Sequence, residues 1–134
     1  MPHHGEEYYL KQKIKAHLAT LHRSGKAMDD RAPPFVLMPV PGGFGGHHLD
    51  FFCCVLKPSK GVGVFLAIEA KAFGKQPTPR QKATMEAIIQ AGGIAFFADS
   101  FDSYLLNMAV NGLIADPTPP VTIERAIGAD AMKL

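Results

Sequence analysis

The chain has 134 residues, of which 47% are hydrophobic and 19% are charged, and its formal net charge is +2. Such a composition is typical of one globular domain with a substantial core, and it excludes a disordered or a fibrous protein. A net charge this small allows nucleic-acid binding without indicating it, so any basic patch must be local.

The cysteines and the absence of long apolar runs indicate in which cellular compartment we expect the protein. Cys53 and Cys54 are neighbours, and this spacing predicts neither a disulfide framework nor a zinc site. We expect both to be core thiols in a reducing cytoplasm. The sequence has no signal peptide and no apolar run of membrane-spanning length. We therefore expect a soluble, intracellular, cytoplasmic protein of a bacterial or phage-infected host cell, with no membrane partner.

The first predicted element is a helix over residues 6–22. Its apolar residues recur at helical spacing and form one stripe: Leu10, Ile14, Leu18 and Leu21. At 100° per residue, Glu7 lies within about 25° of this stripe and Glu6 about 75° away. Both acids suit the positive end of the helix dipole, but an acid on the buried edge also needs a partner.

A first strand is predicted over residues 35–38, and Pro39 and Pro41 limit its far end. The glycine-rich stretch 42–46 follows. It lacks the Lys-Ser/Thr pair and the helix of a P-loop, which excludes nucleotide binding there. His48 comes next, and it either donates a hydrogen bond to a phosphate or is only a polar residue at the start of a strand.

Two apolar runs, 49–55 and 65–71, flank the turn-forming stretch 57–61 and predict a β-hairpin. With Ser59 and Lys60 at the tip, the numbers of paired residues sum to 119. Asp50 then lies opposite Glu69, and Lys71 shares their face because side chains alternate along a strand. The other face of the hairpin is wholly apolar.

Two carboxylates in this position repel by about 4 kcal/mol at ~4 Å in an effective dielectric near 20. A bound divalent cation would offset that repulsion, since Mg²⁺ prefers oxygen ligands. Lys71 would add a positive charge where negative charge develops on a phosphate. The alternative is a solvated strand end in which Glu69 forms a salt bridge with Lys71.

Three signals open a second helix: Thr78 as N-cap, Pro79 at the first helical position, and Gln81 three residues after the cap. They predict a capping box, in which Gln81 would bond the Thr78 amide. Gly92 and Gly93 end the helix. The cations near its start form a basic cluster suited to phosphate contacts: Lys75, Arg80 and Lys82.

A buried strand over 94–98 follows, and a strand-helix-strand passage of this length predicts parallel pairing. Asp99 or Ser100 is expected to cap a third helix, which includes Phe101 and Met108. The order of elements predicts an α/β fold with a mixed β-sheet flanked by helices, in a single domain over residues 1–115. Residues 116–134 are expected to form a Pro-rich linker and a short C-terminal helix.

Asp50, followed some twenty residues later by Ile68-Glu69-Ala70-Lys71, resembles the D…(D/E)xK signature of restriction-endonuclease-like PD-(D/E)XK nucleases. Gly74-Lys75, Thr78-Pro79, Gln81 and Gly92-Gly93 then make the chain similar, more narrowly, to the VRR-NUC family in its short stand-alone form. The resemblance covers roughly residues 6–110.

The resemblance implies a restriction-endonuclease-like fold and a metal-dependent DNA endonuclease, with selectivity for branched or four-way junction DNA. It implies that Asp50, Glu69 and the backbone carbonyl of Ala70 hold Mg²⁺ or Mn²⁺, and that Lys71 orients the attacking water. It also places Gln81 near the metal and the scissile phosphate, a role that we weigh equally against capping.

The resemblance further implies that a glutamate of the first helix joins the metal site, directly or through water. By its angle Glu7 is the better match, and Glu6 is the fallback. We expect DNA contacts from the remaining polar residues near the site: Lys75, Arg80, Lys82 and His48.

Because so short a chain offers little surface for encircling a duplex, we expect a homodimer. Two other functions compete with the nuclease. One is a non-cleaving nucleic-acid-binding module of the same fold, which the presence of Asp50, Glu69 and Lys71 disfavours. The other is an unrelated interaction or structural domain, in which Glu69→Ala would be harmless.

Overall fold

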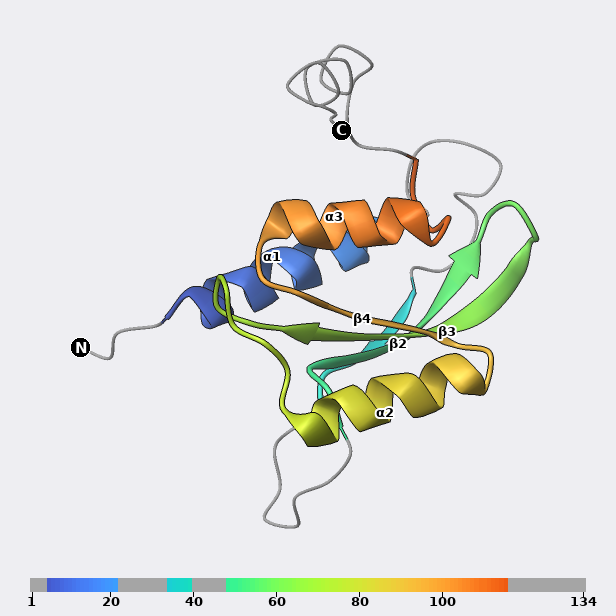
Figure 1. Cartoon of the computed structure of the whole chain (residues 1–134). Coiled ribbons are helices and arrows are strands. Elements are labelled where there is room, and N and C mark those ends of the chain that lie inside the picture. The colour runs from blue at the N-terminus through green and yellow to red at the C-terminus, as the bar shows by residue number, and fades with distance from the viewer. Residues whose placement is uncertain (1–4, 22–33, 40–47, 116–134) are drawn as a thin grey trace, which may run out of the picture.

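The computed structural model describes residues 5–21, 34–39 and 48–115 (Figure 1). The predicted stretch 42–46 and the C-terminal segment 116–134 lie outside these ranges. None of the described helices is long and apolar enough to cross a membrane. The elements follow the predicted order: α1 (Glu6–Thr20), β1 (Phe35–Leu37), β2 (Phe51–Lys57), β3 (Val62–Ala70), α2 (Pro79–Gln90), β4 (Ile94–Ala98) and α3 (Phe101–Val110).

The four described strands form one sheet in the order β1-β2-β3-β4. β1 pairs with β2 and β2 with β3 in antiparallel fashion, whereas β3 and β4 are parallel. α2 connects the parallel pair, as such a pair requires a long crossover. The predicted α/β fold with a mixed sheet flanked by helices is therefore confirmed.

The register of the β2–β3 hairpin is the predicted one. Phe51 pairs with Ile68 and Lys57 with Val62, so paired numbers sum to 119. At the turn, the backbone N–H groups of Lys60 and Gly61 both donate to the Lys57 carbonyl, at 3.0 and 2.9 Å. Gly61 closes the turn with a φ of 66°, which glycine adopts without a Cβ clash.

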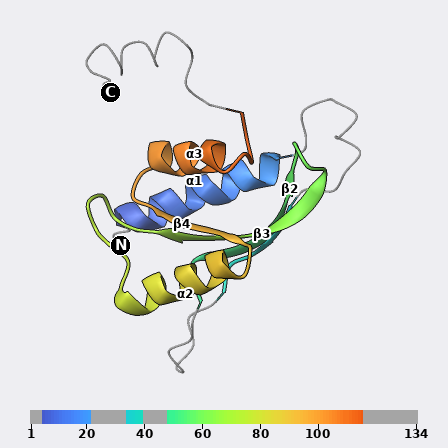
Figure 2. The same ribbon diagram turned by 45° about the vertical axis from the view of Figure 1, so that its right-hand side comes forward.

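Helices cover the two faces of the sheet unequally, with α1 and α3 on one side and α2 alone on the other (Figure 2). The α1/α3 side holds the main core. The predicted apolar stripe of α1 is buried there, and so is the apolar face of the hairpin. The largest fully buried side chains of this core include Ile14, Leu18, Phe51, Leu66, Ile68, Tyr104 and Met108.

One polar contact joins the two helices of this side. The Tyr104 side chain of α3 is fully buried, and its hydroxyl lies 2.7 Å from Nδ1 of His17 in α1. A buried hydroxyl needs such a partner. The contact helps to set how α1 lies on the sheet, and α1 carries residues to the candidate site described below.

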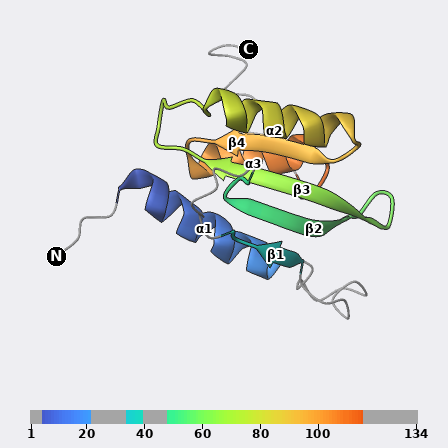
Figure 3. The ribbon, with the colours of Figure 1, turned by 90° about the horizontal axis from the view of Figure 1, so that it is seen from below.

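The α2 side has a smaller core, made of Leu49, Ala67 and Met85 with partly buried neighbours. α2 contacts β4 and leaves β1 and β2 uncovered (Figure 3). The uncovered side chains form an exposed apolar surface, which we call the open face: Phe35, Leu37, Phe52, Cys54 and Phe65.

The open face corrects one prediction. Cys53 is buried, as expected, but Cys54 is exposed and is not a core thiol. Adjacent strand residues point to opposite faces, and no described helix covers β2 on the Cys54 side.

Candidate functional site

Asp50 and Glu69 meet at one end of the hairpin. Asp50 directly precedes β2, and Glu69 is the penultimate residue of β3. The backbone N–H of Asp50 donates to Oε1 of Glu69 at 3.1 Å. The N–H of Ala70 donates to Oδ2 of Asp50 at 2.8 Å. Each carboxylate thus accepts a hydrogen bond from the other strand, and both lie at the same edge of the sheet, as the register predicted.

Burial makes the charge on Glu69 costly. Glu69 is 4% exposed, although it is a carboxylic acid. Its pKa is raised to about 7, mainly by burial and then by the charge of Asp50, while Lys71 opposes both. The Lys71 ammonium lies 3.4 Å from Oε2 of Glu69. The predicted salt bridge therefore exists, but the charge of Lys71 does not fully offset the effects of burial and of Asp50 on the pKa of Glu69.

Gln81 caps its helix and also contacts Glu69. Its Oε1 accepts from the Thr78 N–H at 2.9 Å, and its own N–H donates to the Thr78 hydroxyl at 3.1 Å, which completes the capping box. Its Nε2 donates to Oε2 of Glu69 at 2.8 Å. Because the cap occupies the carbonyl oxygen, the amide nitrogen is turned toward the acid. Helix α2 therefore begins at the candidate site.

The first helix contributes a cation that the sequence analysis missed. The Lys11 ammonium lies 3.5 Å from Oδ1 of Asp50. Lys11 follows Glu7 by four residues and so lies on the same face of α1. This spacing was the signal in the sequence that could have identified it.

The first helix also carries the two acids that were considered for the metal site. The described residues contain no group of three or more His, Cys, Asp or Glu side chains arranged to hold a metal. The predicted role of Glu7 at the metal site stays a prediction. Glu7 lies about 6 Å before Lys11 along the helix axis. Glu6 instead accepts from the Phe73 N–H at 3.0 Å.

The turn after β3 is fixed from two sides. The Lys75 N–H donates to the Ala72 carbonyl at 2.9 Å, and Gly74 has a φ of 82°, as a type II turn requires at its third position. Besides the Glu6 contact, the Gly74 N–H donates to Oδ2 of Asp99 at 3.0 Å. Asp99 therefore stabilises this turn. Ser100, the other candidate cap, is the N-cap of α3.

The predicted DNA contacts surround this edge of the sheet. Lys75 lies in the turn, and Arg80 and Lys82 lie in the first turn of α2, on either side of Gln81; all three are exposed. His48 is half-buried and precedes the buried Leu49. Their roles toward DNA stay predictions.

The donor set fits a hard divalent ion. Two carboxylates stand together: Glu69 is buried and has a raised pKa, and Oδ2 of Asp50 lies beside the backbone of Ala70. Mg²⁺ is often held by one or two carboxylates with waters completing its shell, and Mn²⁺ also suits such oxygen ligands.

No protein-family model matches the sequence, and no curated protein matches it significantly. Among solved structures, the chain is similar to one described as "VRR_NUC domain". The similarity has a TM-score of 0.58 at 15% sequence identity, and it covers 83% of this chain and 100% of that chain. The chain therefore shares its fold, a mixed sheet flanked by helices, with that structure.

Proposed function

We propose that the protein is a metal-dependent DNA endonuclease that hydrolyses phosphodiester bonds, with a preference for branched or four-way junction DNA. The observation that carries the proposal is the pairing of Asp50 with the buried Glu69, beside Lys71 and Gln81. A fold shared with a structure described as a VRR_NUC domain supports it.

Asp50, Glu69 and the carbonyl of Ala70 would hold Mg²⁺ or Mn²⁺, with waters in the remaining positions. When bound, the ion lowers the pKa of water and neutralises charge on the phosphate. Glu69 is prepared for this role because three groups hold its oxygens in place: the Asp50 N–H, the Gln81 amide and the Lys71 ammonium. A contribution of Glu7 through water stays a prediction.

Lys71 orients the attacking water and stabilises the negative charge that develops on the phosphate. Gln81 keeps Glu69 in position from the start of α2. In the reaction, water adds to phosphorus, one P–O bond to a sugar breaks, and the departing sugar oxygen takes a proton. Lys11 balances the charge of Asp50 and adds a second cation near the phosphate.

DNA would lie across this edge of the sheet. The exposed cations Lys75, Arg80 and Lys82 suit contacts to phosphates, which give affinity without sequence preference. His48 would donate to a phosphate beside Asp50.

We also propose a homodimer, formed through the open face. Phe35, Leu37 and Phe65 are 67%, 50% and 46% exposed, and Phe52 stacks on Phe65 with ring centroids 5.8 Å apart. A cavity of about 580 Å³ continues this surface along α2. A second copy would cover these apolar side chains, and a sedimentation mass of one chain would contradict the proposal.

The proposal is tested by incubating the protein with supercoiled plasmid and with a synthetic four-way junction, each in Mg²⁺, Mn²⁺ or EDTA. We expect cleavage with either metal, none in EDTA, and a loss of about 100-fold or more in Lys71→Ala. Cleavage that persists in EDTA, or that is undiminished in Lys71→Ala, would rule out the mechanism. Metal-independent binding without any cleavage would favour the non-cleaving module.

A further inference from the structure

The turn after β3 presents an aromatic ring to solvent on a fixed backbone. Phe73 is 75% exposed. Its N–H is held by Glu6 of α1 at 3.0 Å, and the next N–H, of Gly74, is held by Asp99 at the end of β4, also at 3.0 Å. Two separate elements thus hold the backbone that carries this exposed ring. Such rigidity favours a binding role over a merely tolerated surface residue.

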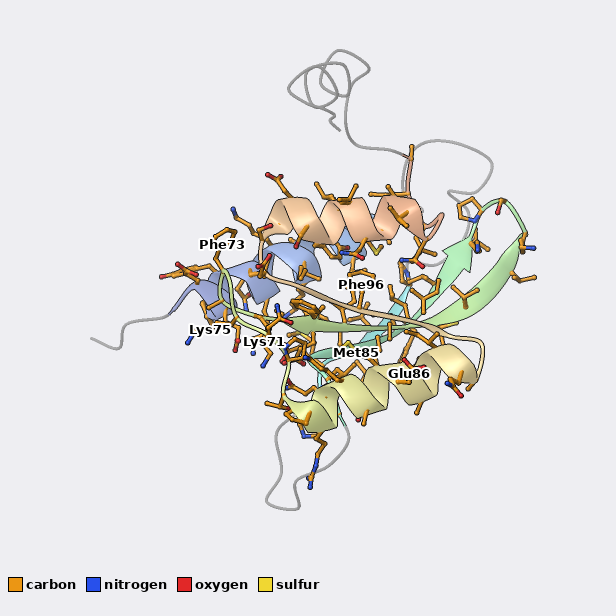
Figure 4. The ribbon with its side chains drawn as sticks, in the orientation of Figure 1. Lys71, Phe73, Lys75, Met85, Glu86 and Phe96 are labelled. Carbon is orange, nitrogen blue, oxygen red and sulfur yellow. The ribbon has the colours of Figure 1, made fainter. Side chains whose placement is uncertain are left out.

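Phe73 forms part of the wall of a cavity of about 340 Å³, together with Tyr9, Phe101 and Lys71. This volume lies at the lower end of the range of small-ligand sites, roughly 300–1,000 Å³. Lys71 also lies 3.4 Å from Glu69, so the cavity adjoins the acid pair. Lys71, Phe73 and Lys75 lie together at this end of the molecule (Figure 4).

The charges that line the cavity balance. Glu6 and Asp99 contribute two carboxylates, and Lys13 and Lys71 contribute two ammonium groups. A phosphate placed inside would meet the carboxylates, whereas a neutral flat ring would stack on the aromatic side chains. Carboxylate oxygens also accept hydrogen bonds from the N–H groups of such a ring. The lining therefore suits a nucleobase better than a phosphate.

We propose that this cavity, the Phe73 cavity, binds an unpaired nucleobase of the DNA strand that is cut. The inference rests on the proposed nuclease function and specifies its substrate. Inside a duplex both faces of a base are stacked on neighbours, so only an unpaired or extruded base can stack on Phe73. Base-aromatic stacking tolerates any base, because every base has a π-face. The cavity thus favours flaps, bulges and other DNA with unpaired bases over plain duplex.

The test compares two DNA duplexes, one fully paired and one with a single unpaired 2-aminopurine nucleotide. Binding is measured with Ca²⁺ in place of Mg²⁺ for wild type, Phe73→Ala and Phe73→Trp. Phe73→Ala leaves the backbone contacts of residue 73 intact, and the side chain that it removes is exposed. Val110→Ala is the matched control, because Val110 is also 75% exposed but lies on α3.

We expect 2-aminopurine fluorescence to be quenched by wild type and by Phe73→Trp. Phe73→Ala should lower affinity for the unpaired substrate roughly 5- to 100-fold while changing affinity for paired duplex by less than about twofold. Val110→Ala should change neither. Equal losses on both substrates, or no loss, would overturn the inference.

Cleavage in Mg²⁺ separates failure of this inference from failure of the proposed function. If wild type cuts DNA and Phe73→Ala cuts both substrates at the wild-type rate, only the base-binding role is wrong. If wild type neither binds nor cuts either substrate, the nuclease proposal fails and this inference fails with it.

Discussion

The two faces of the sheet are built from the same strands but serve different ends. The face under α1 and α3 is apolar, and its central residues are fully buried. The face toward α2 is only partly covered, and Glu69 on it is buried at a cost to its ionised form. Ile68 and Glu69 are neighbours in β3 and take opposite faces. The main apolar core therefore lies on one side of the strand, and the candidate site on the other.

The largest expected effect on stability separates the two faces directly. Phe51 is fully buried on the α1/α3 side, and Phe35 is 67% exposed on the open face. Phe51→Ala should lower the free energy of unfolding by about 3–5 kcal/mol, because it removes a large buried ring and leaves a cavity. Phe35→Ala, the matched control, should change it by less than about 1 kcal/mol. Urea denaturation measures both changes. Similar losses of unfolding free energy in the two variants would contradict the difference proposed between the two faces.

Glu69→Gln should stabilise the protein at high pH. The folded-state pKa of Glu69 is about 7, against its ordinary value of 4.5. Between these values the folded state binds more protons than the unfolded state, so stability falls as pH rises from about 4.5 to 7. Glutamine does not ionise. The variant should therefore gain on the order of 1–3 kcal/mol at pH 8 and little at pH 5.

Thermal unfolding in EDTA at both pH values checks this expectation. Glu86→Gln is a suitable control, because Glu86 is an exposed acid on α2. A Glu69→Gln variant that is less stable than wild type at pH 8 would show that the ionised Glu69 side chain does not destabilise the folded protein. The contrast between the two faces would then be wrong.

Gln81 allows capping to be separated from the site. In Gln81→Glu, one carboxylate oxygen can still accept from the Thr78 N–H. The amide group that donates to Glu69 is replaced by a negatively charged oxygen, which repels that acid. We expect a loss of cleavage of about 10- to 100-fold with unchanged helix stability. Thr78→Ala should do the reverse, costing about 1 kcal/mol of stability with little loss of activity. Wild-type cleavage by Gln81→Glu would leave Gln81 as a cap alone.

The smallest effect concerns Lys11. Its ammonium pairs with Asp50, and it should compete with a divalent ion for that carboxylate. Lys11→Ala should therefore tighten Mn²⁺ binding about two- to fivefold, as measured by calorimetry. Lys15→Ala, one turn further along the exposed part of α1, should leave binding unchanged. Weaker binding in Lys11→Ala would show that the lysine supports the ion instead.

Local chemistry made much of the site predictable. The turn residues around Ser59 set the hairpin register, and the register alone brought Asp50 opposite Glu69. The residues from Thr78 to Gln81 predicted the start of α2 and its capping box. The contact from Gln81 to Glu69 could not be predicted from local sequence, because it depends on where α2 lies over the sheet. Only the family resemblance suggested that Gln81 lies near the site.

Features set by tertiary packing were not predictable in the same way. The contact from Lys11 to Asp50 depends on how α1 lies against the sheet, and helix periodicity gives an angle around an axis but no position along it. Asp99 or Ser100 was expected to cap the third helix; Ser100 does so, and Asp99 instead holds a turn that is distant in sequence. Cys54 is exposed because α2 does not extend over β2, and no local sequence pattern predicts how far a helix covers a sheet.

The central claim is that Asp50 and Glu69 share one divalent ion, and Mn²⁺ titration tests it most directly. Calorimetry on wild type, Asp50→Asn and Glu69→Gln would give the number of sites and their affinity. The account predicts one site per chain in wild type and loss of that site in both variants. Binding that is absent in wild type, or that is unchanged in either variant, would contradict it.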